Sequence, residues 1–580
     1  GLGTVEDGNK YGHGTHVAGI AAANLDGVGT TGVAPDADLL IGKLAYDSGF
    51  FQFNKIPDAM EWAVNNGADV VNISAGTRPS GSYKNSLTEI SEGVYYSNMT
   101  FGDYNTLGYN QIFSTNGHGT AMIESMKGHE TVMVLASGND RLKVSSQESH
   151  IALDSEIGDR VLVVGMYDER RKGLSKWSNA AGTICRELDD DGTCKSDALI
   201  SDRYIIAPGV YIAAPTNNGE YTTMTGTSMA APHVAGAVAI VHQMWPHMTG
   251  ANVSQLLLNT ASTDEINNYD PNVHGQGMLD LDEATQPQGA MGLATTGRID
   301  GATVDLANSG AIAMSGNTNI SALSSIMAVD EYDRDYYFDA NGMVNTIDTR
   351  TASATLAGQH GFAPDYYIGY NGGSIIPVSN AGTHIALNDT NGNVSIVQQW
   401  DKFSMGLVNE SESFLGNYAN SELMKVDGSN TAYVGFTDSI DFNNGINMWG
   451  SATLGATRLN VDNSSMLKSA DIMMSNSATL GIKQTVDNET FGFVASLPVS
   501  ITSGNANFSI PTSVSSTGDI SNTNMNSSLE MDNRELDLGL FYINTLTEST
   551  SFTANIELRN NYSGTSDNHV TAGLTYKVTF

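Results

Sequence analysis

The sequence predicts an α/β domain with a doubly wound parallel sheet, followed by an all-β antiparallel domain. In the first half of the chain, apolar runs alternate with helical stretches, which is typical of parallel strands separated by covering helices. After about residue 286 the composition changes, with more Gly, Ser, Thr and Asn and less Pro. From about residue 350 apolar residues recur at every second position, as in antiparallel strands.

The chain is long and strongly acidic. Its 580 residues are enough for more than one domain. Asp and Glu number 63 against 27 Lys and Arg, so the net charge is −36. This balance argues against nucleic acid as a partner and against docking on anionic lipid. No apolar run is long enough for a transmembrane helix, so the chain is either soluble or crosses a membrane with strands.

Apolar runs predict the elements of the first domain. The predicted strands cover residues 37–44, 69–74 and 161–165, and the predicted helices cover residues 56–66 and 251–260. The second and third strands are apolar almost throughout, as expected of parallel strands covered on both faces. The ligand site of such a sheet lies at the carboxyl ends of its strands.

A serine stands at the predicted start of a helix. Ser228 follows a Gly-Thr turn and opens a run of small apolar residues that continues to about Val241. Pro232 falls in the first turn, where a missing N–H costs nothing. The helix dipole favours negative charge developing near the hydroxyl. Ser228 is therefore a candidate nucleophile, which requires a base and an oxyanion donor.

Two further motifs supply these groups. His13 lies in the sequence GHGTHVAG, and Asn139 lies in ASGND after an apolar run. With GTSMAAPHVAG around Ser228, the sequence resembles a subtilase, a subtilisin-type serine peptidase, over about residues 1–286. The resemblance implies that His13 is the general base, Ser228 the nucleophile and Asn139 an oxyanion donor. It also implies protein or peptide substrates and no required cofactor.

The resemblance assigns substrate-binding residues as well. Ser74, Ala75 and Gly76 end a predicted strand and would pair with the substrate backbone, while Ser137 and Gly138 would line the specificity pocket with them. Ala75 and Gly138 imply a roomy, mostly apolar pocket. The alternative for Gly76 is an ordinary turn at the end of a strand.

The family's catalytic Asp has no counterpart in this sequence. It stands some tens of residues before the His, whereas only Asp7 precedes His13, in a predicted loop, and it is not assigned the role. We expect the Asp strand to lie upstream of Gly1, so that the chain is a processed or truncated product with impaired activity. Loss of this Asp costs on the order of 10⁴-fold in turnover in serine peptidases. The alternative is a degenerate enzyme.

One loop has the spacing of a calcium site in subtilisins. The resemblance implies a side-chain ligand from Asp26 and carbonyl ligands from Asn24, Val28 and Thr30. Calcium here would be structural. A plain tight turn remains the alternative.

The region from residue 77 to the serine motif contains three further features. Residues 77–130 predict a surface insertion, and His118 is interpreted as a surface or insertion residue although GHGT mimics the histidine motif. Cys185 and Cys194 predict one disulfide in an extracytoplasmic protein, with two unpaired thiols as the alternative. The acidic residues 189–191 between them predict a solvated loop rather than a calcium site.

The second half predicts a membrane barrel. Apolar residues alternate with small or polar ones over residues 491–501, 536–542, 552–558 and 570–580. Strands of about ten residues with one apolar, aromatic-rich face are typical of transmembrane β-barrels. About 230 residues, at roughly 20 per strand and loop, allow about 12 strands.

The two halves together resemble a subtilase autotransporter, and the C-terminal Phe580 resembles the recognition signal of outer-membrane barrels. This implies a peptidase domain at 1–286, a linker at 287–340 and a barrel at 341–580. The spacing over residues 320–329 predicts a short helix in the linker.

The implied protein is a serine endopeptidase carried to the Gram-negative outer membrane and cell surface by its own barrel. Its partners would be the outer membrane and the barrel-assembly machinery, and the peptidase part would be released or remain attached. Two alternatives stay open: a catalytically inactive surface adhesin, and a soluble secreted protease with a β-rich binding tail. Alternation alone also predicts a soluble β-sandwich.

Overall fold

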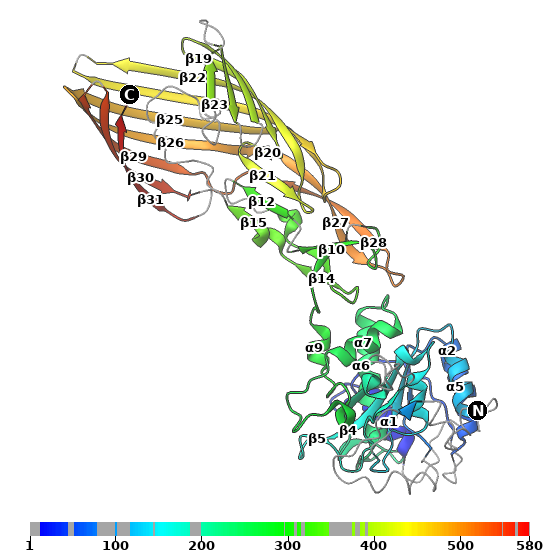
Figure 1. Cartoon of the computed structure of the whole chain (residues 1–580). Helices are drawn as coiled ribbons and strands as arrows, with labels where there is room; N and C mark the ends of the chain where they lie inside the picture. The colour runs from blue at the N-terminus through cyan, green and yellow to red at the C-terminus, as the bar shows by residue number, and fades with distance from the viewer. Residues whose placement is uncertain are drawn as a thin grey trace. The chain divides into compact units, whose positions relative to one another are not determined.

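The fold is described from a computed structural model of the chain, which divides into two units. Unit 1 comprises Gly1–Gln288 and Tyr332–Arg334, and unit 2 comprises Gly289–Glu331 and Asp335–Phe580 (Figure 1). The structure describes residues 12–44, 51–77, 99–100, 117–142, 145–185, 199–294, 296–306, 310–314, 320–346, 374–377, 383–388, 393–442, 444–547, 549–562 and 566–578.

Unit 1 is built on a mostly parallel sheet with helices around it. Its helices are α1 (His13–Ala22), α2 (Ile56–Asn65), α5 (His118–Met126), α6 (Thr227–Met244), α7 (Gly250–Asn259), α8 (Pro271–His274) and α9 (Leu281–Thr285). Its strands are β1 (Val70–Ile73), β2 (Met99–Thr100), β3 (Val132–Ala136), β4 (Val161–Asp168), β5 (Gly173–Leu174), β6 (Ile184–Cys185), β7 (Tyr204–Pro208), β8 (Ile212–Pro215) and β9 (Tyr221–Met224).

The main sheet has the order β1-β3-β4-β5, and β7 also pairs with β4. The pairs β1–β3, β3–β4 and β4–β7 are parallel, whereas β4–β5 is antiparallel. Strands β3 and β4 are buried along their whole lengths, as their continuous apolar runs predict. The predicted doubly wound α/β fold is confirmed.

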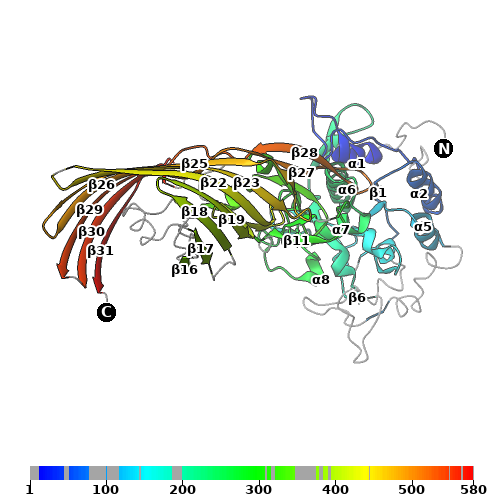
Figure 2. The same ribbon diagram turned by 90° about the horizontal axis from the view of Figure 1, so that it is seen from above.

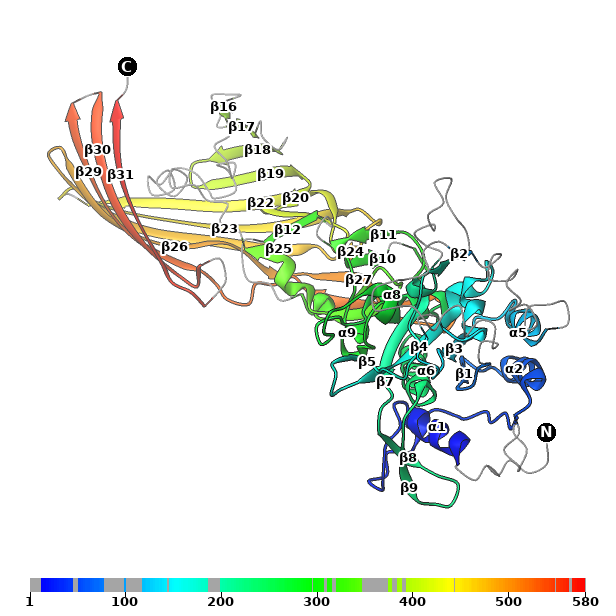
Figure 3. The same ribbon diagram turned by 60° about the horizontal axis from the view of Figure 1, so that its bottom comes forward.

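Alternate side chains of β3 face opposite sides of the sheet. Met133 and Leu135 pack in one buried cluster with side chains of α2 and α5, such as Met60 and Met122. Helix α6 packs against β1, β3, β4 and β7, and it is buried along most of its length. In Figure 3 the β8–β9 hairpin lies beside α1, and a Cβ on Gly19 would lie 2.5 Å from Pro215.

The predicted strand over residues 37–44 is wrong. This stretch belongs to no strand, and Leu39, Leu40 and Ile41 are 42–48% exposed. A strand needs a neighbour for its backbone hydrogen bonds, and no described strand pairs with this one. Its apolar composition therefore does not suffice to make it part of the sheet.

Unit 2 contains antiparallel sheets. Its strands are β10 (Gly292–Ala294), β11 (Thr303–Asp305), β12 (Gly310–Met314), β13 (Ile326–Val329), β14 (Asp335–Phe338), β15 (Val344–Thr346), β16 (Ser374–Pro377), β17 (Thr383–Asn388), β18 (Asn393–Trp400), β19 (Phe403–Ser411), β20 (Ser413–Phe414), β21 (Asn417–Ser421), β22 (Val426–Asp441), β23 (Ile446–Val461), β24 (Leu467–Ala470), β25 (Met473–Val486), β26 (Glu489–Ser503), β27 (Asn505–Val514), β28 (Ile520–Ser528), β29 (Leu536–Thr547), β30 (Thr550–Asn560) and β31 (His569–Val578). No described helix of the chain is long and apolar enough to cross a membrane.

Eleven strands form one curved sheet in unit 2 (Figure 2). Its order is β16-β17-β18-β19-β22-β23-β25-β26-β29-β30-β31, and every neighbouring pair is antiparallel. The predicted all-β antiparallel architecture is therefore present. Within the described part of the chain, β16 and β31 are edge strands, so closure into a barrel of about 12 strands stays a prediction.

The long sheet has one apolar and one polar face. The alternating residues of the sequence, such as Phe491, Phe493, Leu540 and Leu574, are 40–77% exposed on one face. The opposite face carries mostly small and polar side chains. Among the described residues it also holds three aromatic rings that each lie directly opposite a glycine. These pairs are Tyr433–Gly406, Trp449–Gly481 and Phe541–Gly492. Each ring occupies the space that a glycine Cβ would fill.

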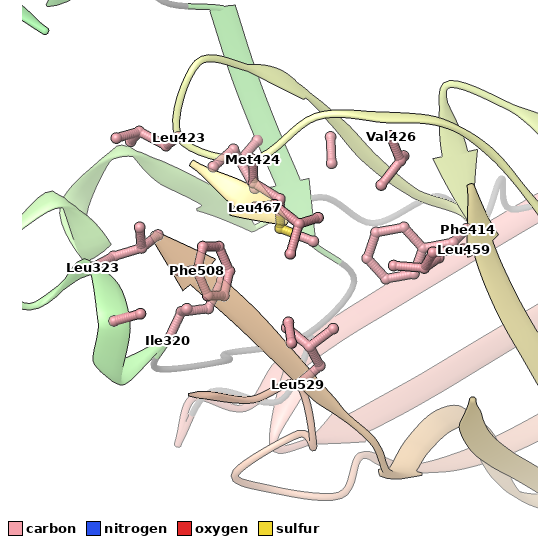
Figure 4. Close-up of a cluster of buried hydrophobic side chains, with 14 of the residues drawn as sticks. Ile320, Leu323, Phe414, Leu423, Met424, Val426, Leu459, Leu467, Phe508 and Leu529 are labelled. Atoms are coloured by element: carbon pink, nitrogen blue, oxygen red, sulfur yellow. The ribbon is translucent and has the colours of Figure 1, made fainter. Parts of the chain in front are cut away.

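The predicted helix over residues 320–329 is wrong. The stretch forms a 3₁₀ turn at Ser321–Leu323 and then strand β13. Figure 4 shows Ile320 and Leu323 in a buried apolar cluster with side chains from distant parts of unit 2, such as Phe508 and Met424. The apolar spacing that suggested a helix therefore reflects burial within a β-rich core.

The glycine–aromatic pairs lead to a stability prediction. A Cβ on Gly481 would lie 2.1 Å from the Trp449 ring. We expect Gly481→Ala to lower the free energy of unfolding by about 1–3 kcal/mol, the usual cost of overpacking. Chemical denaturation of the purified full chain measures this. Gly342→Ala is the matched control, because a Cβ there meets nothing within 4 Å; equal effects of the two substitutions would contradict the prediction.

Candidate active site

Ser228 lies in the first turn of α6 and contacts the end of β1. Its Oγ donates a hydrogen bond to the Ser74 carbonyl at 3.1 Å, and the Ser74 hydroxyl donates to the Ser228 carbonyl at 2.9 Å. Ser228 is half-buried, whereas the next residues of the helix are buried. The fold therefore anchors the helix while its serine stays accessible.

Asn139 is joined to the same turn through Thr227. Its Oδ1 accepts hydrogen bonds from the Thr227 amide at 2.8 Å and from the Thr227 hydroxyl at 3.2 Å. The Gly138 amide donates to the Thr227 hydroxyl oxygen at 3.2 Å. Because the Asn139 oxygen is engaged, its amide Nδ2 is the group left to donate to a substrate. Asn139 is exposed, so a substrate can reach it.

His13 is the first residue of α1. Gly12 caps this helix with φ +61°, and a Cβ there would lie 2.8 Å from the Asn217 amide nitrogen. His13 is half-buried, whereas His16, one turn further, is fully buried and its Nε2 lies 3.2 Å from the Thr222 carbonyl oxygen. Burial lowers the pKa of His16, consistent with a packed helix residue rather than a catalytic one.

The predicted substrate-binding residues lie at one edge of the sheet. Ser74, Ala75 and Gly76 follow β1, while Ser137 and Gly138 follow β3. Since β1 and β3 are parallel neighbours, their carboxyl ends meet at this edge. The structure thus brings both predicted sets together beside Ser228.

A buried carboxylate behind this edge was not identified from the sequence. Glu148 is 1% exposed and accepts hydrogen bonds from the Thr77 amide and the Thr77 hydroxyl, each at 2.8 Å. His118 Nε2 lies 3.1 Å from the same carboxylate. The interpretation of His118 as a surface or insertion residue is wrong in its surface part, because the side chain is only 13% exposed at the start of α5. Glu148 lies in a polar run without apolar periodicity, so nothing in the sequence marks its burial.

The candidate calcium loop has the contacts of a tight turn. Asp26 Oδ1 accepts a hydrogen bond from the Val28 amide at 2.9 Å. The Tyr221 hydroxyl lies 3.4 Å from the Val28 carbonyl, which therefore already has a partner. Among the described residues there is no cluster of three or more His, Cys, Asp or Glu side chains suited to a metal. Such a cluster does not include backbone carbonyls, which make up most of the expected ligand set, so a calcium ion there stays a prediction.

Several residues discussed from the sequence lie outside the described ones. Asp7 lies there, as do Cys194 and the acidic residues 189–191. The disulfide between Cys185 and Cys194 therefore stays a prediction.

The cap of α1 generates a second stability prediction. We expect Gly12→Ala to lower the free energy of unfolding by at least about 2 kcal/mol, since it adds backbone strain to a backbone clash. Thermal unfolding of the purified chain measures this. Gly67→Ala is the control, because Gly67 has φ +79° but open space around it, so strain alone should cost about 1 kcal/mol. A smaller loss in Gly12→Ala than in Gly67→Ala would refute the packing argument.

Comparison with known proteins identifies the family of this chain. Residues 4–282 match the family model described as "Subtilase family". The chain is 31% identical over 280 residues to subtilisin DY of Bacillus licheniformis, covering 48% of this chain and 79% of that protein. It is 29% identical over 284 residues to subtilisin Savinase of Lederbergia lenta, covering 49% and 80%.

Among solved structures, the patellamide maturation protease PatA is 21% identical, with a TM-score of 0.32, over 47% of this chain and 82% of that one. This structural similarity is too low to support an argument about the family. The sequence matches and the order of the three motifs are sufficient by themselves: this chain belongs to the subtilase family of serine peptidases.

Proposed function

We propose that unit 1 is a serine endopeptidase in which Ser228 attacks the peptide carbonyl and His13 accepts the hydroxyl proton. His13 then returns this proton to the leaving amine, and water hydrolyses the acyl-enzyme by the same route. The amide Nδ2 of Asn139 and the backbone N–H of Ser228 would stabilise the oxyanion. The observation that carries the proposal is the pair of hydrogen bonds from Thr227 to Asn139 Oδ1, which leaves Nδ2 as the donor beside Ser228.

Substrate binding would change one contact of the nucleophile. The Ser228 hydroxyl donates to the Ser74 carbonyl in the structure. It must turn toward the His13 imidazole before it can lose its proton. A substrate backbone pairing with Ser74–Gly76 would lie next to this hydroxyl, at the edge of the sheet where β1 and β3 end.

The orienting acceptor for His13 is proposed to be an Asp on a further strand outside the described residues. The exposed apolar residues 39–41 support this, because they form a stretch with strand-like composition and no strand partner among the described strands. A further strand packed beside residues 39–41 would cover their apolar side chains.

We propose that the long sheet of unit 2 is embedded in the outer membrane. Its exposed face is apolar across many strands, as in Leu407, Val434, Leu454, Leu480 and Leu540. A soluble protein rarely exposes so continuous an apolar surface. One end of this face is marked by Asn409, Asn430 and Arg458, which are direct cross-strand neighbours on β19, β22 and β23.

Aromatic side chains gather near the short turns at the other end of the strands. They are Trp400, Phe403, Phe436, Phe442, Phe491, Tyr542, Phe552 and Tyr576. The rings of Phe403 and Phe436 are 5.2 Å apart, and those of Phe491 and Tyr542 are 4.7 Å apart. Aromatic belts of this kind are typical of the membrane–water interface.

The short turns and the aromatic belt support a place in the outer membrane, with assembly by the barrel-assembly machinery and exposure of unit 1 at the cell surface. Short turns at one end and long structured connections at the other are the pattern of outer-membrane barrels. Two alternatives are the inactive surface adhesin and the soluble secreted protease. Covalent labelling tests the first, and mobility in detergent gels tests the second.

The enzymatic proposal is tested by covalent labelling with a fluorophosphonate. We expect the full-length protein to be labelled at Ser228, and Ser228→Ala to abolish labelling. Ser254→Ala, which alters a buried serine on α7, is the control and should be labelled normally. No labelling of the folded parent would reject the enzyme and favour the adhesin.

The oxyanion role has a separate test in steady-state kinetics. We expect Asn139→Ala to lower kcat by about 10²–10³-fold with little change in KM, a range measured for subtilisin itself. A change confined to KM would contradict the role, because an oxyanion donor acts mainly in the transition state.

The membrane proposal is tested by the mobility of the full chain in detergent gels with and without boiling. We expect a heat-dependent shift, because a closed barrel resists unfolding by detergent at room temperature. Leu480→Lys places a charge on the apolar face, where Leu480 is 68% exposed, and should reduce recovery of the chain in the membrane fraction. A monomeric, folded chain in detergent-free buffer would reject the proposal.

A further inference from the structure

Asn179 is a fully buried side chain in unit 1 that no part of the proposed chemistry uses. It is 0% exposed and lies in a turn after β5. An amide buried to this extent must satisfy its donors and acceptors inside the protein. Its partners show what this residue holds in place.

The backbone amide and the side chain of Asn179 make four hydrogen bonds to the loop after β3. Its backbone amide donates to the Gly138 carbonyl at 2.8 Å, and its Nδ2 donates to the Ser137 carbonyl at 3.1 Å. Its Oδ1 accepts from the backbone amides of Asp140 at 2.9 Å and Leu142 at 3.1 Å. These bonds fix the backbone on both sides of Asn139.

The loop is also shaped to receive this side chain. Gly138 has φ +106°, and a Cβ there would lie 2.5 Å from Asn179 Nδ2. Only glycine combines that backbone conformation with such a close approach. Gly138 and Asn179 are therefore fitted to each other, one residue away from Asn139.

A second layer of donors fixes Asn179 itself. The Tyr204 hydroxyl, buried on β7, donates to the Asn179 carbonyl at 2.6 Å. The Ser178 and Ser137 hydroxyls also donate to this carbonyl, at 2.9 and 3.1 Å. Burial raises the pKa of Tyr204, so its hydroxyl keeps its proton and remains a donor.

We infer that Asn179 is a positioning residue for catalysis, which acts by holding the backbone from which Asn139 presents its amide to the oxyanion. The inference rests on the proposed peptidase function and extends it beyond the residues that touch substrate. An oxyanion donor is effective only when its position is fixed before reaction, about 2.7–3.1 Å from the developing charge. Thr227 restrains the Asn139 side chain from one side, and Asn179 restrains its backbone from the other.

The experiment compares Asn179→Ala in two backgrounds of the full-length protein. In the parent, we expect kcat for a peptide p-nitroanilide to fall by about 10- to 100-fold, with KM changed less than about twofold. In an Asn139→Ala background, we expect the same substitution to change kcat less than about threefold, because the donor that Asn179 positions is already absent.

Controls separate positioning from general damage. Thr131→Val removes a buried hydrogen bond of 2.7 Å to the Ala68 carbonyl, between the starts of β1 and β3, and should leave kcat within about twofold. If Asn179→Ala does not fold, Tyr204→Phe takes its place, since it deletes only the hydroxyl that donates to Asn179. It should give a smaller loss with the same dependence on Asn139.

Equal loss of kcat from Asn179→Ala in both backgrounds, or no loss in the parent, would overturn the inference. A folded parent that neither hydrolyses the peptide nor reacts with a fluorophosphonate would instead refute the peptidase function. The two failures are therefore distinguishable.

Discussion

The candidate site depends on the hydrogen bonds between the turn before Ser228 and the loop after β3. Thr227 is fully buried, donates twice to Asn139 Oδ1 and accepts from the Gly138 amide. These bonds join the start of α6 to the carboxyl end of a central strand. Since parallel strands end at one edge, the end of β1 reaches the same place and contacts Ser228 through Ser74. The buried Asn179 side chain forms hydrogen bonds with the backbone of the loop after β3.

Buried polar groups recur behind this site, and each holds a segment of irregular backbone. Asn179 holds the loop around Asn139, and Glu148 holds the backbone at Thr77, just beyond the expected substrate edge. Loops cannot satisfy their own backbone groups as helices do, so a side chain supplies the missing partners. In unit 1 the apolar residues of β3 and β4 build the sheet, whereas buried amides and carboxylates shape the loops at its active edge.

Unit 2 follows a different physical rule. Its long sheet exposes large apolar side chains on one face and packs aromatic rings over glycines on the other. Each ring lies over a glycine of the neighbouring strand and fills the space that a side chain there would occupy. The polar face is therefore closely packed at these three positions. The stretch predicted as a linker, residues 287–340, contributes side chains such as Leu293 and Ile320 to a buried cluster of the same unit. Unit 2 thus combines a buried apolar cluster with an exposed apolar sheet face, and the exposed face is the basis of the proposed membrane insertion.

The amino-acid sequence was sufficient to predict the α/β class of the first half, the helix that starts before Ser228, the alternation of the later strands and the identity of the three motifs. These features are local, because periodicity and small-residue runs are encoded in adjacent positions. The sequence did not predict the local structure of residues 37–44 or 320–329. An apolar stretch forms a strand, a turn or a helix depending on the segments that pack against it. Nor did it reveal the burial of His118 and Glu148 or the contacts of Asn179. Those depend on which backbone groups lack partners in three dimensions, and this is settled only when the chain has folded.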